Sequence, residues 1–239
     1  MPPPRSHGQL HYTGLLVICL LQLAMFTLPA PWNRLSSLGY LLLGIQMLRA
    51  LGGFTSRHSG VSRHPIGRMA YRLIGLSALS MGSVWMLTPI SLRSSGVPVV
   101  VLWAVFAIWS AARLITQLAE ESSVNRVVLR GALAGYLMLG LAAGLVCTGL
   151  ETAQPTSFLG LREQAVLADG LQPVWQLNFV SLNYFAFVTL TTTGFGDIQP
   201  ATPPAQMVSI VIAVVGNVYL VSVLGLLIGR FSSNLTDRS

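Results

Sequence analysis

Six stretches of the sequence are long and apolar enough to form membrane-spanning helices, and this feature most constrains the fold. A helix needs about 20 mostly apolar residues to cross the hydrocarbon core of a bilayer. Charged residues make up only 9% of the chain, whereas a soluble domain carries about 25%, so lipid must solvate most of this chain. The six predicted spans are 12–30, 35–54, 70–90, 97–118, 128–150 and 205–230.

The distribution of arginine predicts the orientation of these spans. All 14 basic residues are arginine, and with a cytoplasmic N-terminus eleven of them fall on the inner side and three on the outer side. Cytoplasmic loops of membrane proteins are enriched in basic residues. We therefore expect a multi-pass protein of the cell (plasma or inner) membrane with both termini cytoplasmic and residues 151–204 facing outward. The arginines form no dense run, which argues against nucleic-acid binding.

A segment rich in threonine and glycine lies between the last two predicted spans. Residues 178–191 predict a helix too short to cross the bilayer, and the run Thr-Thr-Thr-Gly-Phe-Gly-Asp follows at 191–197. This segment resembles the pore signature of potassium channels, in particular the bacterial two-helix pore domain placed behind four additional spans. The resemblance is strong over about 125–230 and weak over the first four spans.

The resemblance implies a selectivity filter, in which backbone carbonyls replace the water shell of a dehydrating potassium ion. Two glycines allow the unusual dihedral angles that aim successive carbonyls at one axis. Non-helical backbone is tolerated at membrane depth where it lines such a path, and because one chain supplies one strand of the lining, four chains must surround the axis. The implied potassium-binding residues are Thr192, with its hydroxyl as the innermost ligand, Thr193, Gly194, Phe195 and Gly196.

Residues around the expected filter take supporting roles by the same resemblance. Tyr184 and Phe185 occupy the position of the paired aromatic residues of the family. Tyr184 is a candidate hydrogen-bond donor to Asp197, and Phe185 is expected to belong to the aromatic cuff around Phe195. The supporting residues are Tyr184, Phe185, Val188, Thr191 and Asp197.

The sequence departs from the family pattern at three positions. Thr193 replaces the usual valine or isoleucine, so its hydroxyl must find a partner behind the filter. Phe195 replaces the commoner tyrosine and lacks the hydroxyl that could anchor the filter. Val188 stands where some members carry a carboxylate, so Asp197 cannot form that acid pair. We therefore expect a filter that is held less firmly and is prone to slow inactivation.

The expected architecture is an all-α membrane protein with six transmembrane helices, and with a re-entrant pore helix and filter between spans five and six. The tails are too short to build a core of their own. The expected divisions are a cytoplasmic tail at 1–11, a four-helix membrane domain at 12–118, a cytoplasmic linker at 119–127, a pore domain (outer helix, pore helix, filter, inner helix) at 128–230 and a cytoplasmic tail at 231–239.

Two residues in the middle of the last span are candidates for gating. Gly216 stands about where family members have a flexible glycine, and it could act as a hinge or simply allow close packing. Asn217 could line the water-filled cavity or bond a neighbouring subunit, because a polar residue at this depth needs one or the other. The fourth span holds a single arginine, Arg113, whereas a voltage sensor needs several, so we expect weak or no voltage dependence.

The leading functional hypothesis is passive, potassium-selective conduction by a homotetramer in a lipid bilayer. The alternatives are a weakly selective monovalent cation channel, a potassium-transporter subunit and a non-conducting regulatory subunit. The seven acidic residues are dispersed, so no arrangement of an enzyme active site is expected. Cys19 and Cys147 lie far apart in apolar stretches, which predicts neither a disulfide nor a metal site. No cofactor is expected besides potassium as the permeant ion.

Overall fold

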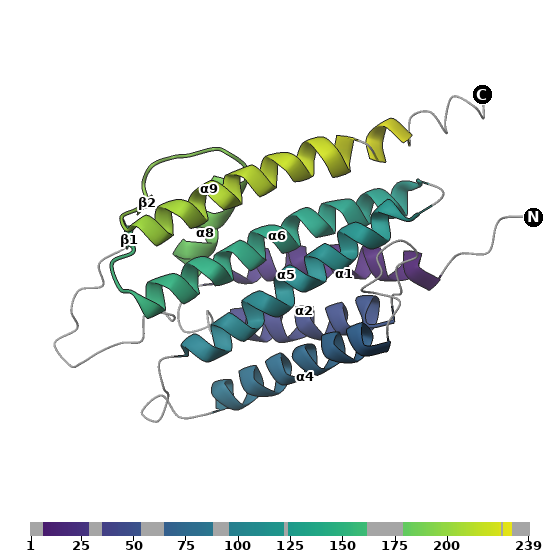
Figure 1. The fold of residues 1–239 in the computed structure, drawn as a ribbon, viewed down its shortest axis with the longest axis horizontal. Helices are drawn as coiled ribbons and strands as arrows, with labels where there is room; N and C mark the ends of the chain where they lie inside the picture. The colour runs from purple at the N-terminus through teal and green to yellow at the C-terminus, as the bar shows by residue number, and fades with distance from the viewer. Residues whose placement is uncertain are drawn as a thin grey trace, which may run out of the picture.

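The chain folds into a bundle of long helices that run side by side (Figure 1). The computed structural model describes residues 7–28, 35–53, 65–87, 96–121, 124–161, 179–225 and 227–230. The expectation of a mostly helical chain is confirmed. The elements are α1 (His7–Met25), α2 (Leu35–Leu51), α4 (Pro65–Leu87), α5 (Val97–Ala119), α6 (Arg126–Ala153), β1 (Phe158–Leu159), α8 (Phe179–Leu190), β2 (Gln199–Pro200), α9 (Pro203–Val218) and the π-helix η3 (Tyr219–Leu224).

Three helices are long and apolar enough, by length and composition, to cross a membrane. They are α5, α6 and the run from Pro203 to Arg230, which includes residue 226 outside the described part of the chain. Shorter apolar helices lie at His11–Met25 and Leu38–Leu51. Each of the six predicted spans therefore falls largely on a helix, and the last three are those that meet the length and hydropathy requirement.

Several helix ends differ from the prediction, and at the starts of α4 and α6 the reason is a local signal that extends the helix. We predicted a third span from residue 70, but α4 begins at Pro65, where the fixed φ of proline suits the first helical position. The fifth span was predicted from residue 128, but α6 begins at Arg126, where the side-chain oxygen of Asn125 accepts hydrogen bonds from the amides of Val127 and Val128 at 2.9 and 3.0 Å. Such capping satisfies amides that have no partner within the helix.

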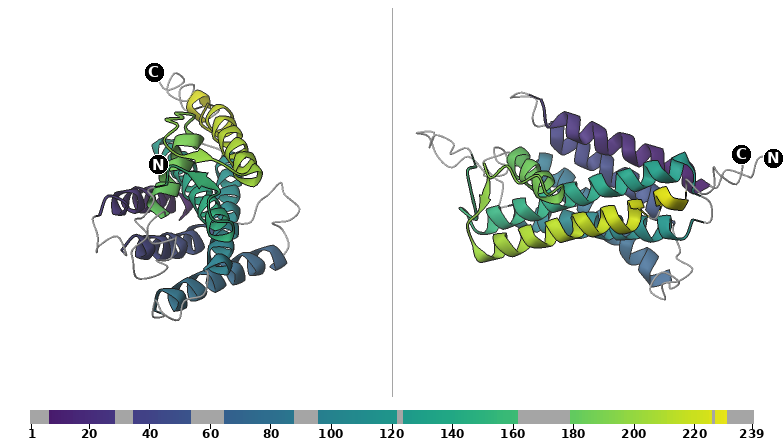
Figure 2. Two further views of the ribbon diagram at one scale, coloured as in Figure 1. Left: turned by 90° about the vertical axis from the view of Figure 1, so that its left-hand side faces the viewer. Right: turned by 90° about the horizontal axis from the view of Figure 1, so that it is seen from above.

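Helix α6 occupies the centre of the bundle. It contacts α1, α5, α8 and α9, and the end-on view in Figure 2 places α9 on one side of it and α1, α2 and α4 on the other. Glycines allow this close packing: a Cβ at Gly140 would overlap the ring of Phe187, and one at Gly144 would overlap the amide of Asn183. Both contacts join α6 to α8, the short helix that precedes the candidate site.

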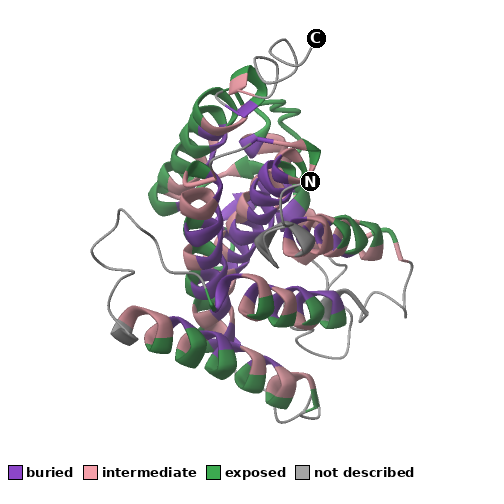
Figure 3. Ribbon diagram, turned by 90° about the vertical axis from the view of Figure 1, so that its right-hand side faces the viewer, coloured by how far each residue is buried: buried purple, intermediate pink, exposed green. Residues whose placement is uncertain are grey.

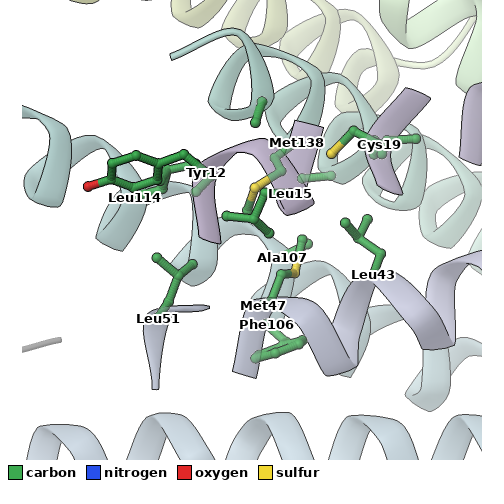
Figure 4. Close-up of a cluster of buried hydrophobic side chains, with 14 of the residues drawn as sticks. Tyr12, Leu15, Cys19, Leu43, Met47, Leu51, Phe106, Ala107, Leu114 and Met138 are labelled. Atoms are coloured by element: carbon green, nitrogen blue, oxygen red, sulfur yellow. The ribbon is translucent and has the colours of Figure 1, made fainter. Parts of the chain in front are cut away.

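The main hydrophobic core lies where α1, α2, α5 and α6 meet (Figure 4). Tyr12, Leu15 and Met47 from the first two helices are at most 1% exposed, as are Phe106 from α5 and Met138 from α6. Figure 3 shows the buried residues concentrated along the central helices and the exposed residues on the outer faces. The N-terminal helices are therefore packed into one body with α6 and its neighbours.

The single arginine of α5 is buried in this body. Arg113 is 6% exposed, and the carbon of its guanidinium lies 4.4 Å from the centre of the Tyr71 ring. The hydroxyl of Tyr71 is in turn 2.9 Å from that of Ser110. Stacking of a cation on an aromatic face is attractive. This contact therefore helps to hold the Arg113 side chain between α4 and α5.

Candidate functional site

The chain leaves helical geometry directly after α8, in the run 191–197. The φ angles are +57° at Thr192, +62° at Gly194 and +78° at Gly196, whereas those of Thr193 and Phe195 are not positive. When φ alternates in sign, successive peptide groups are turned so that their carbonyls face one side of the strand and their N–H groups the other. This backbone is therefore suited to presenting a row of carbonyl oxygens, as the sequence predicts.

Thr192 adopts the left-handed region although its side chain is β-branched. Such a conformation costs of order 1–3 kcal/mol and persists only where the surroundings enforce it. The amide of Thr192 donates to the carbonyl of Thr189 at 3.0 Å, and its hydroxyl donates to the carbonyl of Thr191 at 2.7 Å. Since a hydroxyl keeps lone pairs after donating its proton, the Thr192 oxygen remains able to bind a cation.

The hydroxyl of Thr193 has the partner that its position requires. It lies 2.8 Å from the hydroxyl of Thr191, which is itself 2.8 Å from the carbonyl of Phe187. A carbonyl can only accept, so Thr191 gives its proton to Phe187 and Thr193 donates to Thr191. The amide of Thr193 also donates to the carbonyl of Val188 at 2.9 Å. Threonine at 193 is thus tied to the last turn of α8.

Two contacts hold the outer end of the run. The side-chain nitrogen of Gln199 donates to the carbonyl of Gly196 at 2.9 Å, a role that the sequence analysis did not assign. The rings of Tyr184 and Phe195 are stacked, with centres 6.4 Å apart and planes 3° apart. The Asp197 carboxylate lies near the Tyr184 hydroxyl. Tyr184 therefore lies beside both Phe195 and Asp197.

Phe185 is expected next to Phe195, but within the single chain its ring contacts Phe158 instead. Phe185 is 6% exposed and packs against Phe158, with ring centres 5.1 Å apart. Successive residues of a helix point in different directions, and within this chain the ring that lies against Phe195 is that of Tyr184. Within the chain Tyr184 contacts Phe195, and Phe185 anchors α8 to the β1 segment.

A buried carboxylate that no sequence motif singled out supports the turn before β1. Glu151, near the end of α6, is 4% exposed. Its two oxygens accept hydrogen bonds from the amides of Thr156 and Phe158 at 2.9 and 3.0 Å. Thr156 has a φ of +67°, so this carboxylate stabilises a strained turn. The apolar run that ends just before Glu151 was the available signal that its carboxylate would be buried.

The turn held by Glu151 leads to the filter through a short antiparallel pairing. Strand β1 pairs with β2, with Leu159 opposite Gln199, the residue that bonds the Gly196 carbonyl. Gly160, with a φ of +79°, packs so closely on the backbone carbonyl of Asp197 that no side chain would fit there. The end of α6 is thereby linked to the C-terminal end of the run 191–197.

Replacing Glu151 with glutamine should weaken this link. A glutamine side chain offers one acceptor oxygen instead of two, so one buried amide loses its partner at a cost of about 1–3 kcal/mol. We expect a lower unfolding temperature and faster hydrogen exchange at the amides of Thr156 and Phe158. Thr152→Val is the matched control, because the Thr152 hydroxyl bonds only its own helix, at the carbonyl of Thr148. Equal exchange in the two variants would contradict this role for Glu151.

On the inner helix, Gly216 is buried and faces α8. A Cβ at Gly216 would overlap the backbone carbonyl of Leu190, the last residue of α8, and the hydroxyl of Tyr136 donates to the same carbonyl at 3.3 Å. Of the two alternatives for Gly216, the structure therefore supports close packing. Asn217 is exposed in the single subunit.

A wider helical turn begins three residues after Gly216. Residues Tyr219–Leu224 form a π-helix, and the buried hydroxyl of Tyr219 donates to the carbonyl of Ala132 in α6 at 2.6 Å. π-Helical turns are rare and are found frequently at functional sites. The sequence makes Gly216 a candidate hinge, whereas the irregular turn of this helix lies at η3.

One side of the candidate site is uncovered in the single subunit. Residues 191–197 are all exposed, and Phe195 is 68% exposed. Among the described residues, and apart from the chain neighbours of each glycine, no atom lies within 4 Å of a Cβ built on Gly194 or Gly196. Large apolar side chains of α9 are exposed on the same chain, among them Met207, Ile210, Val211, Val214 and Val218.

Comparison with known proteins identifies this part of the chain. Residues 156–233, less than half of the 239 residues, match a family model described as an ion channel. No curated protein and no solved structure matches the chain significantly. The matched stretch runs from the turn held by Glu151 through α8 and the run 191–197 into α9 and beyond, so the similarity to an ion channel covers the candidate site.

Proposed function

We propose that the chain is one subunit of a homotetrameric, potassium-selective channel that conducts passively. The observation that carries this proposal is the alternation of φ along Thr192–Gly196, in the run that resembles the potassium-channel signature. A stack of carbonyl oxygens of this kind can replace the hydration shell of potassium. Potassium would bind at the carbonyls of Thr192, Thr193, Gly194 and Phe195.

The tetramer is supported by what the single chain leaves uncovered. The run 191–197 is exposed in the single subunit, and α9 also presents exposed large apolar side chains. Exposed non-helical backbone is not stable against lipid and must face protein or a water-filled path. Four copies around an axis satisfy both requirements, with Asn217 facing the cavity or the neighbouring subunit.

In this proposal α8 is a re-entrant pore helix between a fifth and a sixth span, and α1, α2, α4 and α5 are the first four spans. The boundaries are those expected from the sequence: a four-helix membrane domain at 12–118 and a pore domain at 128–230, with both termini cytoplasmic in the cell membrane. α8 points its C-terminal end toward the filter run, where the negative end of the helix dipole favours a cation.

Potassium flux into vesicles tests the proposal directly. Purified protein is reconstituted into vesicles loaded with potassium chloride and diluted into sodium chloride, and proton uptake driven by potassium efflux is followed after addition of a protonophore. We expect uptake that depends on the protein and disappears when potassium replaces sodium outside. Absence of uptake from correctly assembled protein would favour the regulatory-subunit alternative.

Replacing Thr193 with valine should preserve potassium flux. Valine has nearly the shape of threonine, and the implied ligand at this position is the backbone carbonyl. The change removes only the 2.8 Å contact with Thr191, whose net contribution to stability is about 1 kcal/mol. The same vesicle assay checks this, with assembly followed by size-exclusion chromatography. Loss of flux from assembled Thr193→Val would show that the threonine hydroxyl takes part in conduction.

A further inference from the structure

The family match begins at residue 156 and leaves the first four helices without a role. These helices do not lie apart from the filter region, because α1 and α5 pack along α6 and α2 reaches α8. The contact between α2 and α8 is made by two polar side chains in an otherwise apolar setting. Polar groups buried in such a setting need hydrogen-bond partners, because an unpaired buried polar group costs free energy.

Asn183, in the first half of α8, is fully buried. Its side-chain nitrogen donates to the carbonyl of Phe179 at 2.9 Å, and its side-chain oxygen accepts from the hydroxyl of Tyr40 in α2 at 3.0 Å. Because the carbonyl of Phe179 can only accept, the orientation of the Asn183 amide is determined, and Tyr40 must be the donor. Gly144 of α6 packs against the same amide, which further restricts the conformation of the Asn183 side chain.

The ring of Tyr40 is fixed from several sides. It packs edge-on against Phe179 of α8 and Trp103 of α5, with centres 5.4 and 6.2 Å away, and against Phe26 after α1 at 6.5 Å. Aromatic pairs in these geometries are attractive. Contacts from α8, α5 and the residue after α1 thus restrain the Tyr40 ring, whose hydroxyl bonds Asn183. A tyrosine that faces lipid would be far less restrained.

This contact acts on the helix that carries the filter. Leu190, the last residue of α8, is seven positions after Asn183, which corresponds to about 10 Å along the helix axis. The next residue, Thr191, already belongs to the hydroxyl network of the filter. A small tilt of α8 at Asn183 therefore displaces the point from which the filter starts.

We propose that the Tyr40–Asn183 hydrogen bond is a positioning contact through which the first four helices hold the pore helix and so stabilise the conducting filter. This inference rests on the proposed channel function. Neither residue contacts the permeant ion. Their effect on conduction passes through the position of α8, so it should depend on how firmly ions themselves hold the filter.

The test compares single-channel currents of wild type, Tyr40→Phe and Tyr71→Phe in planar bilayers. Tyr40→Phe keeps the ring and removes the hydroxyl, leaving the Asn183 oxygen buried without a donor, and we expect current to decay about tenfold faster. Raising the potassium concentration should slow this decay, because ions that bind the conducting filter stabilise it. Tyr71→Phe is the matched control, since it removes a buried hydroxyl that bonds Met47 and Ser110 away from α8.

The double variant Tyr40→Phe, Asn183→Leu supplies a second, independent measure. Replacing both partners of a buried hydrogen bond with apolar groups of similar shape is often nearly neutral, so the double variant should decay more slowly than Tyr40→Phe alone. If Tyr40→Phe does not assemble, Asn183→Leu removes the same bond from the other side. Failure of both to assemble, while Tyr71→Phe assembles, would overturn the inference, because the contact would then serve folding alone.

The outcomes separate this inference from the function on which it rests. Wild-type protein without potassium current would remove the proposed function and the inference together. Wild-type current with identical decay in Tyr40→Phe and Tyr71→Phe would leave the channel in place and overturn the inference. Faster decay confined to Tyr40→Phe, and relieved by potassium, is the expected result.

Discussion

Replacing Gly194 with alanine is expected to abolish potassium flux while the protein still assembles. The φ of Gly194 is +62°, and a Cβ in this left-handed region costs roughly 1–2 kcal/mol in each chain. Apart from the two neighbouring residues, no atom in the described part of the chain lies within 4 Å of the added carbon. The effect therefore acts through the backbone. Alanine favours a negative φ, and adopting it would turn the carbonyl of residue 194 away from the proposed row of ion-binding carbonyls.

The control for this variant is Gly149→Ala in α6. It makes the same chemical change in a regular helix, where the added carbon would lie 3.4 Å from Val100, an ordinary contact distance. Flux is measured in the vesicle assay, and assembly by size-exclusion chromatography. Wild-type flux from Gly194→Ala would show that the alternating backbone is not the conducting element.

The second large effect is expected at Gly216, where alanine should destabilise the assembled protein. The added carbon would overlap the carbonyl oxygen of Leu190, a backbone atom that cannot swing away as a flexible side chain can. Forcing extra atoms into a packed interior costs about 1–3 kcal/mol. α9 and α8 must therefore move apart, and both the unfolding temperature and the flux should fall.

Gly229→Ala provides the comparison in the same run, Pro203–Arg230, because no atom of the residues that the structure describes lies within 4 Å of its added carbon, its chain neighbours aside. The measurement is thermal unfolding of the purified protein, together with flux. A hinge at Gly216 predicts a different pattern, with altered opening and unchanged stability. That pattern would contradict the packing role that the structure supports.

Local sequence patterns predicted the helices of this chain well, because length, hydropathy and capping are local properties. Asn125 and Pro65 start helices slightly earlier than the apolar runs suggest, and both are recognisable helix-start residues. The run 191–197 was equally readable, since glycine at 194 and 196 allows positive φ. Thr192, with the same sign of φ, could not be predicted from its own propensity, because the surrounding turn imposes it.

Contacts between distant segments were beyond the reach of these patterns. Glu151 and Gln199 are separated in sequence by α8 and the run 191–197. The pairing of β1 with β2 connects the turn that Glu151 holds to Gln199, which bonds the Gly196 carbonyl. Tyr40 and Asn183 are 143 positions apart, and nothing in either local sequence indicates the other. Which of Tyr184 and Phe185 contacts Phe195 within the chain depends on how α8 is rotated against α6, which follows from the packing at Gly140 and Gly144.

The measurement that tests the central claim most directly is the reversal potential of purified protein in a planar bilayer, with potassium chloride on one side and an equal concentration of sodium chloride on the other. The proposed filter predicts a reversal potential displaced by about 59 mV for every tenfold preference for potassium over sodium. We expect a displacement that corresponds to at least a tenfold preference, with an open probability that depends little on voltage. A reversal potential near zero would contradict potassium selectivity and leave a weakly selective cation channel.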